Sequence, residues 1–219
     1  YSNSEREMRV MKRRTFDRIL SMVGAMLTLV LIVAGAMLMW GANFASSQVS
    51  SQLKEQGVYF PAKGDAGFDA TTYPTLQKWA GQQLTTGEQA KAYANDYIAH
   101  HLKAINGGKN YAQTSADAMK LQNQASLDAV AANNSPEDQT LVDAADASAT
   151  AAAAANEKVN LLFRGETLRG LLLTSFAFWQ VGQIAFISGI FAFGAAIVML
   201  ILTLLGFAHL RRTPADAQI

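Results

Sequence analysis

Two stretches of the chain are predominantly apolar and contain no Asp, Glu, Lys or Arg. The first follows Arg18 and ends before Lys54, and the second follows Arg169 and ends before Arg211. A helix needs roughly 20 apolar residues to cross the hydrocarbon core of a bilayer, and each stretch exceeds that length. The pattern therefore predicts two transmembrane helices, at residues 19–41 and 184–209.

The second apolar stretch is about twice as long as one span requires. Its first part, residues 170–183, contains polar groups such as Thr174, Gln180 and Gln183. We interpret it as an interfacial helix extension that projects above the bilayer or packs on another protein. The first apolar run is longer than the ~7–15 residue core of a signal peptide, so we expect it to be an uncleaved anchor.

The segment between the spans, residues 42–169, shows helical patterns and no β alternation. Thr86 and Gln89 form a capping-box pattern before an apolar stripe, which Asn106-Gly107-Gly108 ends. Shorter helices are expected after Tyr73-Pro74 and from near Thr114. The predicted fold class is an all-α membrane protein, a two-helix transmembrane hairpin with a large external helical domain between the spans.

Ser135-Pro136 is typical of a helix start, and only Gly165 interrupts the helical pattern from there to Arg169. We expect one long helix that runs from about Pro136 into the second span. The Ala-rich residues 123–155 indicate a projecting, weakly packed hairpin. The expected core is small and Ala-rich, which predicts marginal stability for the isolated domain.

Basic residues flank the spans unequally. Two tails carry most of these cations, residues 1–18 before the first span and residues 210–219 after the second. The positive-inside bias places both tails in the cytoplasm and the large domain on the external side of the membrane. The net charge is only +1. We interpret the basic N-terminal tail as a topology determinant that contacts anionic lipids, and expect no nucleic-acid partner.

Small residues recur at helical spacing in both spans. Such residues let two helices approach closely in lipid. The two faces either pack on each other as an antiparallel hairpin or dock on a foreign membrane protein. The predicted helix–helix packing residues are Ser21, Gly24, Ala25, Thr28, Gly35, Ala185, Ser188, Gly189, Ala192 and Ala196.

Aromatic and basic residues near the span ends are candidates for contact with lipid or with a partner. Amphipathic rings favour the membrane interface, and cations favour headgroups. The cluster at residues 164–169 is either a solvated turn of helix or a docking site for lipid headgroups or a partner. The predicted interface residues are Arg13, Arg14, Trp40, Phe44, Arg164, Arg169, Phe178 and Trp179.

The sequence contains no recognisable set of catalytic residues. There is no cysteine, and neither span contains an Asp, Glu, Lys or Arg that would mark a proton or ion path. Asp96 and His100 have metal-ligand spacing, yet no third ligand is near in sequence. We expect no enzymatic activity, no metal and no cofactor.

Several sequence strings together resemble a known family. They are residues 13–17, 43–45, 59–61, 80–83 and 163–170, which read RRTFD, NFA, YFP, AGQQ and FRGETLRG. They resemble actinobacterial two-span membrane proteins similar to the accessory, association-factor subunits of the cytochrome bcc–aa3 respiratory supercomplex. The resemblance covers nearly the whole chain except the Ala-rich residues 135–155.

The resemblance implies a non-catalytic accessory subunit of the respiratory electron-transport chain. It would stabilise the supercomplex or assist its assembly, and it would carry no cofactor. Its partners would be membrane lipids and other integral membrane subunits of a cytochrome bcc or cytochrome c oxidase complex. The alternative is an independent cell-envelope scaffold or sensor whose external helical domain binds a ligand or a protein.

Overall fold

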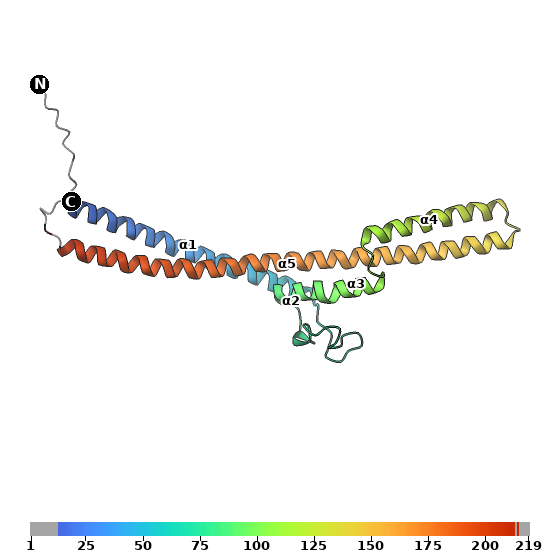
Figure 1. The fold of residues 1–219 in the computed structure, drawn as a ribbon, viewed down its shortest axis with the longest axis horizontal. Helices are drawn as coiled ribbons and strands as arrows, with labels where there is room; N and C mark the ends of the chain where they lie inside the picture. The colour runs from blue at the N-terminus through green and yellow to red at the C-terminus, as the bar shows by residue number, and fades with distance from the viewer. Residues whose placement is uncertain (1–12, 213, 215–219) are drawn as a thin grey trace, which may run out of the picture. The chain divides into compact units, whose positions relative to one another are not determined.

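The structure is a computed structural model that describes residues 13–212 and 214, with side chains from Arg14 onward. Within these residues the protein is all-α (Figure 1). The helices are α1 (Arg13–Gln56), α2 (Gly87–Ala92), α3 (Ala99–Ile105), α4 (Tyr111–Asn134) and α5 (Gln139–Arg212). The predicted tails fall mostly outside this part of the chain, at residues 1–12, 213 and 215–219.

Two compact units divide the described chain. The first, called the hairpin unit below, holds α1 up to Ser47 and α5 from Gln180 onward. The second, called the helical unit, comprises Gln48–Trp179. Helices α1 and α5 each contribute residues to both units because neither is broken at these positions.

Helix α5 is 74 residues long and has no interruption (Figure 1). The prediction of one continuous helix into the second apolar stretch is confirmed. Helix α1 likewise continues past the first span, to Gln56. The start of α5 is corrected from Pro136 to Gln139. Asp138 Oδ1 accepts the Thr140 backbone N–H at 3.0 Å and so caps the helix, while Ser135 follows the end of α4.

Helix α2 begins as its sequence predicts. The Thr86 side chain accepts the Gln89 N–H at 3.2 Å, and Gln89 Oε1 accepts the Thr86 N–H at 3.1 Å. Between α2 and α3 the helix widens into a π-helical segment, Tyr93–Ile98, which the apolar periodicity does not indicate. After Ile105 the chain turns at Gly107 and Gly108, whose positive φ angles of 57° and 81° favour glycine.

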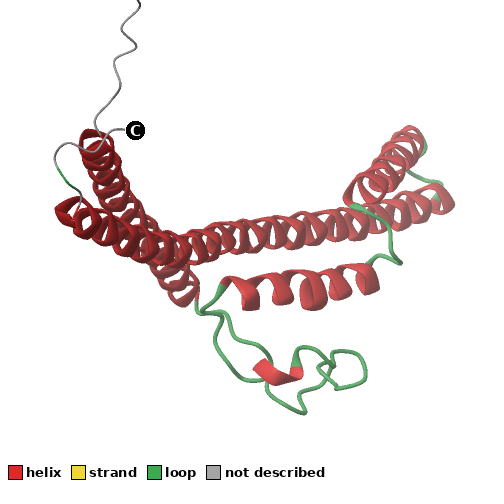
Figure 2. Ribbon diagram, turned by 60° about the vertical axis from the view of Figure 1, so that its left-hand side comes forward, coloured by secondary structure: helices red, strands yellow, loops and turns green. Residues whose placement is uncertain are grey.

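The segment between α1 and α2 is a long loop that is interrupted by a single 3₁₀ turn, Gln77–Trp79 (Figure 2). The helix expected after Tyr73-Pro74 is therefore shorter than predicted. Asp69 Oδ1 accepts the Thr71 and Thr72 N–H groups at 2.9 and 2.8 Å, which folds the loop back on itself. Tyr59 and Gln83 form an antiparallel bridge that brings the two ends of the loop together.

Helix α4 runs beside the first part of α5, and both views show the two as a hairpin (Figures 1 and 2). The start of α4 is corrected from Thr114 to Tyr111, because Asn110 supplies the cap through a capping box with Gln113. Only Thr114 and Ala118 of α4 are buried. This agrees with the expected weak packing of the Ala-rich segment.

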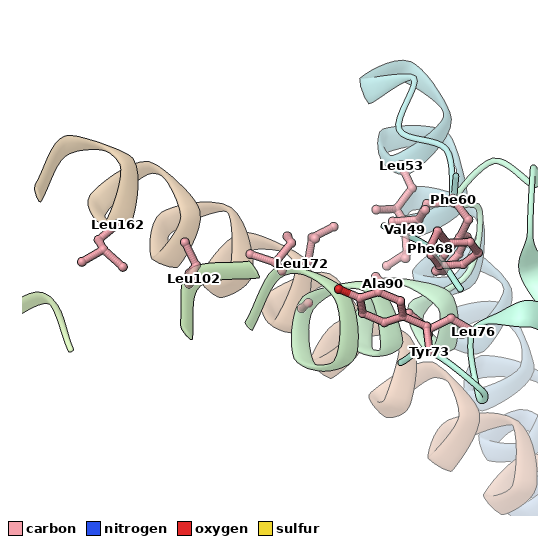
Figure 3. Close-up of a cluster of buried hydrophobic side chains, with 13 residues drawn as sticks. Val49, Leu53, Phe60, Phe68, Tyr73, Leu76, Ala90, Leu102, Leu162 and Leu172 are labelled. Carbon is pink, nitrogen blue, oxygen red and sulfur yellow. The ribbon is translucent and has the colours of Figure 1, made fainter. Parts of the chain in front are cut away.

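The core of the helical unit is aromatic and aliphatic, so the expectation of an Ala-rich core is wrong. The loop that precedes α2 supplies its largest members, including Phe60 and Phe68, each 1% exposed. The end of α1, helices α2 and α3, and the middle of α5 supply the rest of the cluster, with Leu102 and Leu162 at the end away from Phe60 and Phe68 (Figure 3). The buried residues of this cluster are Val49, Leu53, Phe60, Phe68, Tyr73, Leu76, Leu84, Ala90, Ala94, Ile98, Leu102, Leu162 and Leu172.

Candidate functional site: the seam between the two long helices

In the hairpin unit, α1 and α5 pack along a seam of small residues that recurs every seven positions. A seven-residue repeat keeps one face of a helix toward its partner and gives left-handed supercoiling. The buried residues at this spacing are Ser21, Thr28, Gly35 and Ala42 on α1, and Gly182, Gly189, Ala196 and Thr203 on α5. Gly24 of α1 is buried beside them. The small side chains let the two antiparallel backbones approach closely.

Two hydroxyl side chains near one end of the seam lie on glycines of the opposite helix. A Cβ atom at Gly24 would lie 2.6 Å from Thr203 Oγ1, and a Cβ atom at Gly206 would lie 2.7 Å from Ser21 Oγ. Any larger residue at either glycine would displace the hydroxyl that faces it. The two pairs are reciprocal, so each helix supplies one hydroxyl and one glycine.

The threonine hydroxyls of the seam differ in their hydrogen bonding. Thr28 Oγ1 donates to the Gly24 carbonyl one turn earlier at 2.8 Å. Thr203 Oγ1 is buried and makes no hydrogen bond within the described residues.

Farther along the seam, glycines accommodate large side chains. The Phe193 ring lies over Gly35, where a Cβ atom would be 3.2 Å from two ring carbons. Met39 covers Gly189 in the same way, and Ala45 lies against Gly182. Glycine at these positions therefore allows a phenylalanine and a methionine to fit between helices that are otherwise in close contact.

An ionisable pair lies next to the Ser21 end of the seam. Asp17 Oδ2 is 3.9 Å from His209 Nε2, and the Asp17 side chain is only 19% exposed. Asp17 Oδ2 accepts no hydrogen bond from the described residues. The apolar pattern of the chain does not indicate this pair, because the two residues are at opposite ends of the sequence.

The structure brings together most of the residues predicted for helix packing. Ser21, Gly24, Thr28 and Gly35 are buried in the seam, as are Gly189 and Ala196. Ala185 and Ala192 flank it and are half-buried, whereas Ala25 and Ser188 are exposed. The seam also includes Gly182, Thr203 and Gly206, which the prediction omitted; Gly182 lies before the predicted span of residues 184–209.

The outward faces of both helices are strongly apolar. For example, Met37, Met26 and Phe191 are 68%, 69% and 74% exposed. In the most apolar 18-residue windows of α1 and α5, only 17% and 11% of the residues are buried. By length and composition, both helices are suited to cross a membrane.

The predicted interface residues have different environments. Trp40 and Phe44 are 71% and 54% exposed and stack with ring centroids 5.7 Å apart. Phe178 is 64% exposed, whereas Trp179 is half-buried and packs on Gly87 within the helical unit. Arg14 and Arg164 are exposed, and the side chain of Arg13 lies outside the described residues.

Arg169 is not a free surface cation. Its Nε donates to the Ala94 carbonyl at 3.1 Å, and its terminal nitrogens reach Asn95 Oδ1 at 3.3 Å and Glu166 Oε2 at 2.7 Å. Ala94 lies in the π-helical segment, and its carbonyl also accepts the Ala99 N–H five residues later. Arg169 therefore ties α5 to the widened turn, a contact that local sequence pattern does not reveal.

A network of rings surrounds the π-helical segment. Tyr97 lies 4.9 Å from Tyr93 and 4.4 Å from His101 between ring centroids. His101 Nδ1 is 3.0 Å from the Tyr97 carbonyl and 3.3 Å from the Tyr73 hydroxyl. Burial raises the pKa of Tyr73, Tyr93 and Tyr97, so the neutral phenols are favoured.

His100 and His101 do not form a metal site with neighbouring carboxylates. His100 packs edge-on to Tyr73 at 5.2 Å, and His101 is held by Tyr97 and Tyr73. Over residues 13–212 no group of three or more His, Asp or Glu side chains is placed to hold a metal ion. The geometry gives these histidines a packing role.

Comparison of the chain with models of protein families, with curated proteins and with solved structures finds no match.

Proposed function

We propose that α1 and α5 cross the bacterial cell membrane as an antiparallel two-span hairpin, with the helical unit on the external side. The observation that carries this proposal is the apolar surface of the hairpin unit. Soluble proteins rarely expose contiguous apolar patches larger than a few hundred Å², because such surfaces associate. Lipid tails are as apolar as this surface, so they can cover it without a free-energy penalty. Helices in lipid associate through close packing, which the small residues of the seam allow.

The direction of insertion follows from the basic residues. Arg14 and Arg18 precede the first apolar stretch, and Arg211 and Arg212 follow the second. The positive-inside rule places these cations in the cytoplasm. Arg164 and Arg169 lie near the other boundary and oppose this direction. Arg169 is engaged by Glu166 and the Ala94 carbonyl, so of these two only Arg164 is exposed.

Introduced cysteines test this topology cleanly, because the chain has none of its own. Lys109 is exposed in the helical unit and Arg212 is exposed at the end of α5. A membrane-impermeant maleimide should label Lys109→Cys in intact cells and Arg212→Cys only after permeabilisation. Equal labelling of both variants in intact cells would exclude the hairpin topology.

The chain then acts as a non-catalytic accessory subunit that stabilises an actinobacterial respiratory supercomplex of the cytochrome bcc–aa3 type or assists its assembly. The family resemblance supplies the identity of the complex. The structure supports a holding role, since the hairpin unit combines a tightly packed seam with outward apolar faces. One side of such a hairpin can contact other integral membrane subunits while the remainder contacts lipid.

Copurification tests the accessory role. The tagged full-length chain, extracted in a mild detergent, should be recovered in fixed ratio with haem-containing subunits. Deleting the chain should reduce the fraction of cytochrome bcc that migrates together with cytochrome c oxidase. Recovery of the chain alone, or with cell-wall enzymes, would refute this role without affecting the topology.

One observation favours the alternative of an independent envelope scaffold or sensor. The helical unit has its own aromatic core, and a hollow of about 220 Å³ lies between α4 and α5 next to Lys109 and Asp117. The two side chains form an ion pair of 2.7 Å at the rim of this hollow. If this alternative is correct, a soluble ligand should protect the Lys109→Cys variant from maleimide in the isolated protein.

A further inference from the structure

We propose that a groove between α1 and α5 in the hairpin unit binds the glycerol-ester region of one phospholipid. This inference rests on the proposed membrane insertion and goes beyond the accessory role. The groove has a volume of about 330 Å³. The residues that line it are Met39, Ala42, Asn43, Ser46, Gln183 and Phe186.

The lining combines apolar surface with neutral hydrogen-bonding groups. Asn43, Ser46 and Gln183 contribute two amides and a hydroxyl, and none of these side chains has a hydrogen-bond partner within residues 14–212. No charged side chain lines the groove. Along each helix the nearest charged residue is about two turns or more away. The groove therefore suits an occupant that presents uncharged polar atoms next to hydrocarbon.

The aromatic residues beside the groove indicate its depth in the membrane. Trp40 precedes Asn43 by about one helical turn, and its ring stacks on Phe44 in an exposed pair. Such rings favour the region between hydrocarbon and water. The ester groups of phospholipids occupy the same region, so their carbonyl oxygens would lie at the level of the unpaired amides.

The energetics favour an occupant with acceptor atoms. An amide that is withdrawn from water without a hydrogen-bond partner is costly, and water is scarce below the ester region. Lipid ester carbonyls would accept hydrogen bonds from the amide groups of Asn43 and Gln183. An acyl chain would then lie against Met39 and Phe186, while the charged headgroup stays in water.

The size of the groove distinguishes a lipid from a partner helix. Its lining covers residues 39–46 of α1 but only residues 183–186 of α5, about one helical turn. A third helix packed on the hairpin would need contacts over several turns. A local groove with a flexible methionine at one side suits a single acyl chain and its ester group.

Native mass spectrometry of the full-length chain in detergent tests the proposal. The probes are dioleoyl phosphatidylglycerol and its dialkyl ether analogue, which lacks the ester carbonyls. We expect one ester lipid to be retained per chain. The ether analogue should be retained about threefold to tenfold less for each hydrogen bond that is lost.

The variants Asn43→Leu and Gln183→Leu should lose the preference for the ester lipid. Gln180→Leu is the matched control, since Gln180 is exposed one turn away and does not line the groove. Leucine makes each site more apolar, so binding driven by hydrophobic contact alone would not fall. Disulfide formation between Ser21→Cys and Gly206→Cys in each variant reports that the hairpin is still packed.

Three outcomes would overturn the proposal. These are equal retention of the ester and ether lipids, undiminished preference in Asn43→Leu and Gln183→Leu, or no retained lipid on the wild-type chain. The last outcome would instead favour a helix of another subunit as the occupant. Failure of the accessory role would appear in copurification and would leave lipid retention unchanged, so the two failures are distinguishable.

Discussion

The hairpin unit and the helical unit hold their helices together in opposite ways. In the hairpin unit the fully buried residues are all small, and most of the large side chains point outward. In the helical unit the large side chains are buried, with Phe60, Phe68, Leu76 and Leu84 each at most 1% exposed. The same helices, α1 and α5, contribute to both arrangements.

The difference reflects what surrounds each unit under the proposed topology. In water, burial of apolar surface contributes about 25 cal/mol per Å², so large side chains at the core give the greatest gain. In lipid that gain is absent, and close packing of backbones replaces it. We therefore expect the two units to respond differently to the same kind of substitution.

The largest effect is expected from truncation of the aromatic core. Phe60→Ala would remove a ring that stacks on Trp79 at 5.5 Å and meets Tyr93 edge-on at 5.2 Å. The substitution should lower the free energy of unfolding of the helical unit by about 3–5 kcal/mol, from lost transfer energy and the cavity it leaves. Denaturant titration followed by tryptophan fluorescence measures this change.

The neighbouring residue provides the control for Phe60. Tyr59 is 56% exposed, so Tyr59→Ala removes a ring of similar size from the surface. It should cost much less than Phe60→Ala. Equal losses for the two variants would mean that the aromatic cluster is not the stabilising core of this unit.

The next largest effect is expected from enlargement of a residue in the seam. Gly24→Leu would place side-chain atoms where Thr203 Oγ1 lies, since even a Cβ atom there would be only 2.6 Å away. Overpacking of this kind costs about 1–3 kcal/mol. The helices should separate locally, and disulfide formation between Ser21→Cys and Gly206→Cys should slow.

That disulfide is a sensitive measure of the seam. A Cβ atom at Gly206 would lie 3.7 Å from Ser21 Cβ, within the range of about 3.5–4.5 Å found in disulfides. Ala25→Leu is the matched control, because Ala25 is exposed next to Gly24. Rapid cross-linking that is unaffected by Gly24→Leu would contradict the proposed register.

A smaller effect is expected at the contact between α5 and the π-helical segment. Arg169→Gln would remove the donor to the Ala94 carbonyl and the ion pair with Glu166. We expect a loss of about 1–2 kcal/mol, since hydrogen bonds from charged groups contribute somewhat more than neutral ones. Amide hydrogen exchange should accelerate in residues 93–99.

Arg164→Gln is the control for Arg169, because Arg164 is exposed on the same helix. Its effect on hydrogen exchange and on stability should be small. If both variants accelerate exchange equally, Arg169 contributes only its charge to the surface. Comparing the two variants thus separates the specific contact between Arg169 and the π-helical segment from the effect of removing one positive charge.

The smallest effect is expected from alkaline pH and is confined to the helical unit. Burial raises the pKa of Tyr73, Tyr93 and Tyr97 above the ordinary value of 10.0. A raised pKa in the folded state gives a stabilising contribution that is complete below pH 10.0 and is lost as the pH rises through the folded-state pKa. Thermal melts from pH 8 upward should therefore show falling stability above about pH 10.

Tyr93→Phe sharpens this prediction, because burial raises the pKa of the Tyr93 phenol and the substitution removes only its hydroxyl. The variant keeps the ring contacts with Phe60 and Tyr97 but has no group to ionise. Its stability should decline less steeply at alkaline pH than that of the wild-type chain. An unchanged slope would show that other groups cause the alkaline loss.

The sequence by itself determined the features that depend on neighbouring residues. Thr86 and Gln89 identify the start of α2, since a capping box needs only residues three positions apart. Gly107 and Gly108 mark the end of α3, and this signal also lies in neighbouring residues of the chain. The continuity of α5 is also a local property, because its residues favour helix and no proline interrupts it.

Only the tertiary structure decided the features that join distant parts of the chain. Ser21 faces Gly206 and Thr203 faces Gly24 because of the antiparallel register, which no local pattern specifies. Asp17 and His209 meet at the end of the seam for the same reason.

The helical unit shows the same distinction. Its core includes Phe60 and Phe68, which lie in a loop without helical periodicity. Their rings pack on Tyr93 and Tyr97 of the π-helical segment, which follow them by about 30 residues in the chain. Sequence pattern identifies an element when the contacts that stabilise it lie within a few residues. Where the stabilising contact joins residues far apart in the chain, as in the seam and the aromatic core, folding in three dimensions selects the partner.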